Sequence, residues 1–140
     1  MEDVSRGSGV LLIDARGWIL LQLRDAHAAY PFHWATVGGG NEDGEEDEAA
    51  ARRELTEETG YIVGALQLGA RVGLTAPDGS PRVATLYTAR YDGVQSILCL
   101  EGLRIDFIDP AALDALLIYP GQRGLIDAAL DAASSAETTL

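Results

Sequence analysis

Three glutamates at helical spacing are the residues of this chain best suited to chemistry. Glu54, Glu57 and Glu58 stand at positions i, i+3 and i+4, so on a helix their carboxylates share one face. Mg²⁺ and Mn²⁺ prefer oxygen ligands, and such a cation would relieve the repulsion among three neighbouring negative charges. The stripe therefore indicates a divalent-cation site. The alternative is a solvated acidic face, which is the usual nature of helical glutamate clusters.

The residues around the stripe favour a helix. The segment 47–59 contains neither glycine nor proline and is rich in Ala, Glu, Arg and Leu, which are strong helix formers. Gly60 follows it directly, and glycine is the common residue just past a helix end. The sequence therefore predicts a helix from about Glu46 to Thr59.

A glycine-rich segment precedes the predicted helix. Three successive glycines, residues 38–40, follow a predicted strand over Trp34–Val37. Without side chains, this backbone can approach a ligand or a metal closely. Glu45 precedes Arg53 by eight residues near the start of the helix, so the two side chains could form an ion pair that fastens the loop to the helix.

The segment from Gly39 to Tyr61 resembles the Nudix box of the Nudix hydrolases. Every fixed polar and glycine position is filled, and so long a pattern of constrained positions is highly specific. Two positions depart from the usual pattern: Tyr61 replaces an aliphatic residue, and Val37 replaces a proline. Gly39, Glu45, Arg53 and Gly60 match structural positions of the motif. The segment reads Gly39, five residues, Glu45, seven residues, and Arg53-Glu54-Leu55-Thr56-Glu57-Glu58-Thr59-Gly60-Tyr61.

The resemblance implies an enzyme and its metal site. The expected activity is Mg²⁺- or Mn²⁺-dependent cleavage, by water attack on phosphorus, of the diphosphate linkage in a nucleoside triphosphate, an oxidised nucleotide or a nucleotide sugar. Such an anionic linkage resists attack unless its charge is neutralised and a water is held in line. By resemblance, Glu54, Glu57, Glu58 and the backbone carbonyl of Gly38 bind the metal. Glu54 or Glu57 also orients or deprotonates the water, and members of the family differ in which residue does so.

Three residues outside the box are further candidates. Arg24 ends a predicted strand over Trp18–Arg24, where the family often has an arginine that contacts phosphate; a surface arginine is the alternative. Trp34 ends an aromatic cluster that begins at Tyr30 and could stack on a nucleobase, although aromatic residues beside a strand more often belong to the core. Glu101 is a candidate extra metal ligand or base, with a solvated loop carboxylate as the alternative.

The composition of the chain limits the classes of molecule that it is expected to bind. The 140 residues suggest a single domain, 1–140, and carry a formal charge of −12 without any lysine, which argues against binding a nucleic-acid backbone. Arg71 and Arg82 receive no predicted role. Cys99 is the single cysteine and is expected to be a buried small hydrophobe. The sequence shows no signal peptide and no membrane-spanning stretch, so the expected location is the cytoplasm.

Strand and helix patterns alternate along the chain without a linker or a repeat. Composition alone predicts an α/β or α+β fold, and the resemblance implies the Nudix-type α/β/α sandwich with a mixed β-sheet. Besides the box helix, strands are expected over 9–14, 18–24, 34–37, part of 61–74, 82–91, 95–100 and 104–108. Helices are expected from Pro110 to about Leu117 and from Gln122 to about Ala133, followed by a flexible tail over about 134–140.

Several functional alternatives remain open. A non-hydrolytic Nudix-like module that senses a nucleotide would be expected to have lost carboxylates, and none is lost here. A structural domain leaves the box spacing unexplained, and an isomerase would need a Cys and His pair that is not recognisable. The sequence does not identify the substrate, whose specificity is expected to come from the loops Asp25–His33 and Thr75–Pro81. A small nucleotide-type substrate is expected. The oligomeric state is left open, with a homodimer, which is common among members of the family, as one alternative.

Overall fold

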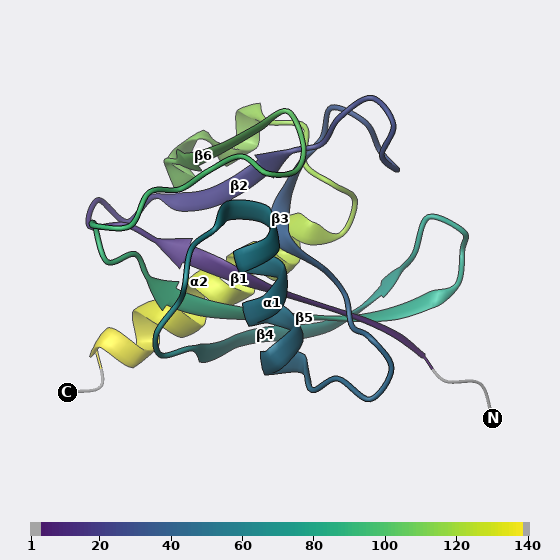
Figure 1. Cartoon of the computed structure of the whole chain (residues 1–140), viewed down its shortest axis with the longest axis horizontal. Helices are drawn as coiled ribbons and strands as arrows, with labels where there is room; N and C mark the ends of the chain where they lie inside the picture. Colours follow the sequence, from purple (N-terminus) through teal and green to yellow (C-terminus); the bar gives the residue numbers. More distant parts are fainter. Residues whose placement is uncertain (1–3, 139–140) are drawn as a thin grey trace.

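A computed structural model describes residues 4–138, and its centre is one six-stranded mixed sheet (Figure 1). The strand order is β4-β5-β1-β3-β2-β6. The β1–β5 pair is parallel and the other pairs are antiparallel. In chain order the elements are β1 (Ser5–Ile13), β2 (Ile19–Leu23), β3 (Trp34–Gly40), α1 (Asp47–Thr59), β4 (Gln67–Thr75), β5 (Pro81–Arg90), β6 (Arg104–Ile108), the 3₁₀ helix η1 (Pro110–Ala115) and α2 (Gln122–Thr138).

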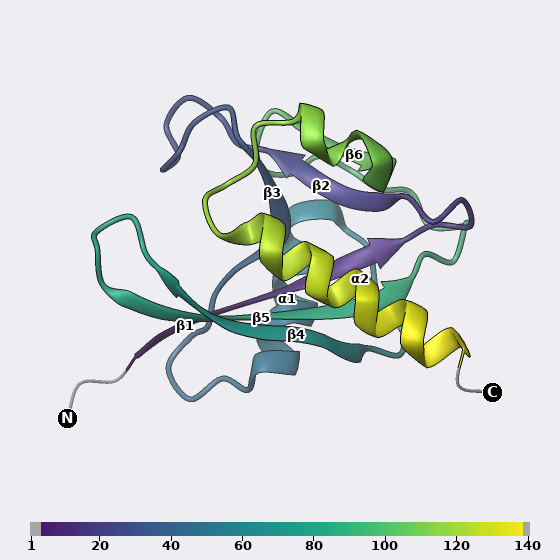
Figure 2. The ribbon, with the colours of Figure 1, turned by 180° about the vertical axis from the view of Figure 1, so that it is seen from behind.

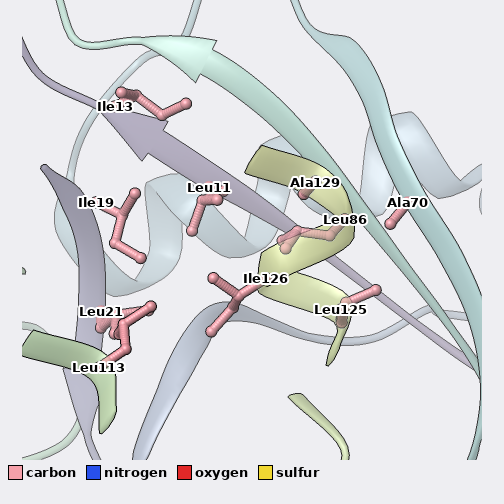
Figure 3. Close-up of a cluster of buried hydrophobic side chains, with 10 residues drawn as sticks. All are labelled: Leu11, Ile13, Ile19, Leu21, Ala70, Leu86, Leu113, Leu125, Ile126 and Ala129. Atoms are coloured by element: carbon pink, nitrogen blue, oxygen red, sulfur yellow. The ribbon is translucent and has the colours of Figure 1, made fainter. Parts of the chain in front are cut away.

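The two α-helices cover opposite faces of the sheet, as Figures 1 and 2 show from the two sides. Successive strand residues point to opposite faces, so β1 contributes to two cores. Leu11 joins the cluster that packs against α2, which is drawn in Figure 3. Val10 and Leu12 join the cluster that packs against α1. The predicted α/β/α sandwich with a mixed sheet is confirmed.

Helix α1 begins and ends where the sequence predicts. Leu55 is fully buried against the sheet, and burial of such a side chain stabilises the fold by roughly 1.5–3 kcal/mol. Gly60 ends the helix with a positive φ of 77°, and its N–H donates to the Thr56 carbonyl over 2.8 Å. This left-handed conformation favours glycine.

The strand predicted over 95–100 is wrong. The segment is irregular, because its backbone donors bind the free carbonyls at the end of α1 instead of another strand. The N–H of Leu98 donates to Thr59 and that of Leu100 to Glu58, both over 2.9 Å. Cys99 lies in the same segment and is exposed, so the expectation of a buried cysteine is also wrong.

The C-terminal helix is longer than expected. Helix α2 continues to Thr138, because residues 132–138 contain neither glycine nor proline to stop it. Residues 134–138 of the expected tail are therefore helical, and residues 139–140 lie outside the described part. Between Val4 and Thr138, no helix has the length and apolar character that crossing a membrane requires.

Candidate active site

Strands β1 and β3 pair beside α1 through small residues. Three of them, Gly38, Gly39 and Gly40 at the end of β3, form what is here called the glycine strip. Gly40, Gly39 and Gly38 of β3 lie opposite residues 7, 8 and 9 of β1. A Cβ added at Gly39 would lie 2.6 Å from the carboxyl carbon of Glu54. Only glycine therefore leaves room at this point for the first carboxylate of the stripe.

The three glutamates of the stripe face one recess, and Glu101 completes its acidic lining. Their exposure differs sharply: the Glu57 side chain is 57% exposed and that of Glu54 is 14% exposed, whereas residue Glu58 is 2% exposed. The structure therefore brings together the three glutamates predicted as metal ligands and the candidate extra ligand, which comes from the segment that docks on the end of α1. Gly38 lines the adjoining cavity.

Glu58 carries the strongest electrostatic signal of the site. Its Oε1 accepts a hydrogen bond from Gln22 Nε2 over 2.9 Å, while its buried Oε2 has no hydrogen-bond partner among the described residues. Burial, with the neighbouring Glu101 and Glu54 carboxylates adding to the effect, raises the pKa of Glu58 to about 10. A buried, unsatisfied carboxylate oxygen is destabilising, and a cation would satisfy it.

Arg53 connects three parts of the site: the glycine strip, the loop before α1 that carries Glu45, and the glutamate stripe of α1. Its Nε and Nη2 donate to the two carboxylate oxygens of Glu45, each over 2.9 Å, so the predicted pairing is present and bidentate. These hydrogen bonds lower the pKa of Glu45 to about 2. Nη2 also donates to the Gly40 carbonyl, and Nη1 donates to both Glu54 and Glu57, each over 3.1 Å.

The acidic residues fit a divalent cation after a small rearrangement. Over residues 4–138, no three His, Cys, Asp or Glu side chains already stand in an arrangement that would hold a metal ion, because Glu54 and Glu57 are turned toward Arg53. The exposed Arg53–Glu57 pair is worth only about 0–1 kcal/mol, so releasing Glu57 is easy. The unsatisfied oxygen of Glu58 and the repulsion that raises its pKa both favour a cation.

Gln22 is a site residue that the sequence pattern did not predict. It is 4% exposed, and its Nε2 donates both to Glu58 and to the Glu101 carbonyl, the latter over 3.1 Å. It thereby orients a buried carboxylate and holds the Glu101 segment against strand β2. The available signal was one amide within the otherwise apolar run Ile19–Leu23, since a buried polar side chain needs partners.

A cavity of about 500 Å³ extends from the carboxylates across the glycine strip. Residues of both loops expected to set specificity line it, including Asp25 and Thr75. Arg24, the candidate phosphate contact, also lines the cavity, and its Nε donates to the Ala29 carbonyl over 2.6 Å. The guanidinium carbon lies 5.0 Å from the ring centroid of Tyr119, which is a cation–π distance.

The structure does not bring Trp34 to the cavity. Its side chain packs against the core cluster under α2, and the described cavity lining does not include it. Tyr119 is the aromatic residue of that lining, and its ring lies 5.0 Å from that of Tyr30. No local pattern predicts a role for Tyr119, because the segment after η1 reaches β3 only through tertiary pairing, in the bridge between Trp34 and Ile118.

Known proteins share both the sequence pattern and the fold. The NUDIX domain model matches residues 4–126. An RNA pyrophosphohydrolase of Caulobacter vibrioides is 32% identical, over 89% of this chain and 82% of that protein. The MutT protein of Methanosarcina mazei Go1 matches with a TM-score of 0.78 at 17% identity, over 99% of both chains. The MutT NUDIX hydrolase of Burkholderia pseudomallei matches with a TM-score of 0.72 at 25% identity, over 91% of this chain and 97% of that one.

These matches agree with the geometry of the box. The fold expected from the resemblance is confirmed, as is the expected enzyme class, a pyrophosphohydrolase acting on phosphorus-containing anhydrides. The matched region includes the glycine strip, the acidic stripe and the segment that carries Glu101. The chain belongs to the Nudix hydrolase family.

Proposed function

We propose that this enzyme cleaves the diphosphate linkage of a nucleoside diphosphate derivative in a reaction that depends on Mg²⁺ or Mn²⁺. The observation that supports this proposal most strongly concerns Glu58, which is a buried carboxylate at the acidic end of the cavity. One of its oxygens has no hydrogen-bond partner among the described residues. The cavity volume of about 500 Å³ lies in the range of small-molecule sites. A nucleotide can therefore place its phosphates beside the carboxylates and its remaining groups along the glycine strip.

Glu54, Glu57, Glu58 and the Gly38 carbonyl would hold the cation, with Glu101 as an extra ligand. When bound, such an ion neutralises phosphate charge and makes a water easier to deprotonate. The chain itself supplies the positioning. Gln22 orients Glu58, and the Cβ-free backbone of Gly39 leaves room for the Glu54 carboxylate.

Either Glu54 or Glu57 accepts the proton of the attacking water. Burial raises the pKa of Glu54, and the Arg53 guanidinium opposes that effect, so Glu54 is the carboxylate whose basicity the protein environment adjusts. As the water oxygen bonds to one phosphorus, the bond from that phosphorus to the bridging oxygen breaks. The bridging oxygen leaves with the other phosphoryl group. Arg24 would contact the phosphates through its guanidinium.

The substrate is proposed to be a small nucleotide. The charge of −12 and the absence of lysine disfavour a long nucleic-acid contact. A nucleoside triphosphate would yield a nucleoside monophosphate and pyrophosphate. The RNA pyrophosphohydrolase relative supports the same type of bond cleavage, and a 5′-triphosphorylated RNA therefore belongs in the assay.

The test is a substrate panel with matched variants. Purified protein is incubated with Mg²⁺ or Mn²⁺ and nucleoside triphosphates, oxidised nucleotides, nucleotide sugars and a triphosphorylated RNA, and the products are separated by chromatography. We expect metal-dependent cleavage of a free nucleotide that Glu57→Gln loses and Glu48→Gln keeps, because Glu48 pairs with Arg52 outside the recess. Tight nucleotide binding without cleavage would instead support the sensor module.

A further inference from the structure

The segment that joins β5 to β6 carries Glu101 and passes the end of α1 (Figure 1). Its residues 92–103, here called the connecting segment, are irregular throughout. Ile97 packs against the core cluster under α1. Four other apolar side chains of the segment are half exposed or more: Val94, Leu98, Leu100 and Leu103. A segment with so little apolar burial opens easily unless polar contacts hold it in place.

Tyr61 secures the start of the connecting segment. Its side chain is buried, and its ring lies 5.6 Å from that of Tyr91. Its hydroxyl oxygen accepts a hydrogen bond from the backbone N–H of Asp92 over 2.9 Å. The usual residue at this last position of the box is aliphatic, and an aliphatic side chain has no oxygen to accept such a bond. The departure from the usual pattern therefore ties the end of the box to the connecting segment.

Gln95 binds the residue that follows Tyr61. Its Oε1 accepts the N–H of Ile62 and its Nε2 donates to the Ile62 carbonyl, both over 2.9 Å, so the amide pairs with Ile62 as a residue of a neighbouring strand would. Nε2 also donates to Asp92 Oδ2 over 2.8 Å, and Asp92 Oδ1 accepts the N–H of Gln95 over 3.0 Å. Together with the Tyr61 bond, these contacts form what is here called the clasp.

The remaining attachments of the segment lie between the clasp and Glu101. The N–H groups of Leu98 and Leu100 donate to the carbonyls at the end of α1, and Gln22 donates to the Glu101 carbonyl. Both leucines are exposed, and water readily replaces the partner of an exposed hydrogen bond. Without the clasp, the segment should therefore leave the end of the helix more often and carry Glu101 away from the stripe.

We propose that Tyr61 and Gln95 are positioning residues for the hydrolysis, which act by holding Glu101 beside the glutamates of α1. The proposal rests on the proposed function, in which Glu101 is an extra ligand of the cation. Neither residue is among the described residues that line the cavity or the acidic recess, so any effect on catalysis must pass through other residues. Removing such supporting groups typically lowers metal affinity or activity by roughly 10–100-fold.

The first test measures the docking of the connecting segment without substrate or metal. Hydrogen exchange of the Leu98 and Leu100 amides is followed by NMR in the wild type, Tyr61→Phe and Gln95→Ala. We expect both amides to exchange about tenfold faster in the two variants, while the amides of β1 keep their protection. Tyr87→Phe removes a hydroxyl from β5 beside the same core cluster and should change nothing. Unchanged protection of both leucine amides in both variants would overturn the proposal.

The second test asks whether the effect passes through Glu101. Initial rates with the best nucleotide substrate are measured against Mg²⁺ concentration for the wild type, Tyr61→Phe, Glu101→Gln and the double variant. Each single variant should need about tenfold more Mg²⁺ or more for its half-maximal rate. The double variant should resemble Glu101→Gln, because the clasp then has no ligand to position. Losses that multiply in the double variant, or a Glu101→Gln variant with the wild-type dependence, would overturn the proposal.

Gln95→Ala repeats this measurement at a partly exposed position, which keeps the proposal testable if Tyr61→Phe does not fold. Its matched control is Gln67→Ala, at an exposed position of the edge strand β4, which should keep the wild-type dependence on Mg²⁺. Melting curves show which variants are folded. A folded Gln95→Ala variant with the wild-type dependence on Mg²⁺ would contradict the positioning role.

Failure of the proposed function would be visible separately. If the wild type cleaves no nucleotide, calorimetric binding of Mn²⁺ still reports the position of Glu101. Weaker Mn²⁺ binding by both Glu101→Gln and Gln95→Ala than by the wild type supports the positioning role in a protein that does not hydrolyse, and equal binding overturns it. Hydrolysis that keeps its Mg²⁺ dependence in Glu101→Gln would overturn the positioning role alone and leave the proposed function standing.

Discussion

At the residue scale, Glu58 links stability to metal binding. A buried acceptor left without a partner typically costs about 1–3 kcal/mol, and the Oε2 of Glu58 is such an atom among the described residues. Without a cation, the group avoids its charge by keeping a proton, which is why burial raises its pKa to about 10. A proton and a divalent cation therefore compete for the same oxygen.

This competition predicts how the stability of the metal-free protein depends on pH. Glu58 titrates near 4.5 when unfolded and near 10 when folded, so between these values the folded state binds more protons and its contribution to stability falls as pH rises. Thermal melts in EDTA should show this decline, and Glu58→Gln should flatten it. Mg²⁺ or Mn²⁺ should raise the melting temperature most at the upper end of the window. An unchanged slope in Glu58→Gln would contradict the assignment.

A substitution at Gly39 tests whether the glycine strip provides the space that the Glu54 carboxylate needs. In Gly39→Ala the new Cβ must displace the Glu54 carboxyl group, which would lie 2.6 Å away. Because the displaced atoms end a flexible side chain, we expect little change in stability but a fall in kcat/KM of roughly a hundredfold, the effect of moving a catalytic group by about 1 Å. Gly73→Ala, with no atom within 4 Å of its added Cβ, is the matched control and should retain activity.

At the element scale, Arg53 of α1 holds two segments against the helix: the loop that carries Glu45 and the glycine strip. Glu45 accepts two hydrogen bonds from Arg53 and a third from the backbone N–H of Glu42, and its pKa is lowered from 4.5 to about 2. The stabilising effect is therefore complete above pH 4.5 and is lost as pH falls toward 2. Urea unfolding over this acidic window should show a steeper loss of stability in the wild type than in Glu45→Gln. Parallel curves would show that the pair does not anchor the loop.

Elements whose determinants are local could be predicted from the sequence. Helix α1 was predicted from its helix formers and from Gly60, all of which act within a few residues. The strand expected over 95–100 failed because its backbone partners are the carbonyls of Thr59 and Glu58, which no local pattern reveals. The roles of Gln22 and Tyr119 were missed for the same reason, since each depends on contacts made only after the chain has folded.

At the scale of the whole molecule, α2 holds one face of the sheet and also carries part of the cavity wall. Ile126 is fully buried in the cluster drawn in Figure 3, and Ile126→Ala should destabilise the protein by about 2–5 kcal/mol. Leu130→Ala, at a partly buried position of the same helix, should cost less. Urea unfolding measures both changes. Similar losses would mean that α2 packs more loosely than the structure shows.

The fold could be predicted more completely than the site. The alternation of elements and the box together predicted the sandwich, the acidic recess and the Arg53–Glu45 pair. The cavity could not be predicted in the same way, because it combines β1, β3, β5 and the start of α2, which come from distant parts of the chain. Arg82 received no predicted role, since its position over Gly7 exists only once β1 and β5 pair.

The central claim is that Glu58 and its neighbours hold a cation that the hydrolysis requires. The most direct measurement is the initial rate of nucleotide hydrolysis against Mg²⁺ concentration for the wild type, Glu54→Gln, Glu57→Gln and Glu58→Gln, with melting curves for each. We expect saturable dependence on Mg²⁺ in the wild type and a loss of about 10²–10⁴-fold when the catalytic base is removed, with Glu58→Gln folded but needing far more Mg²⁺. Hydrolysis that persists in EDTA, or a Glu58→Gln variant with the wild-type dependence on Mg²⁺, would contradict the claim.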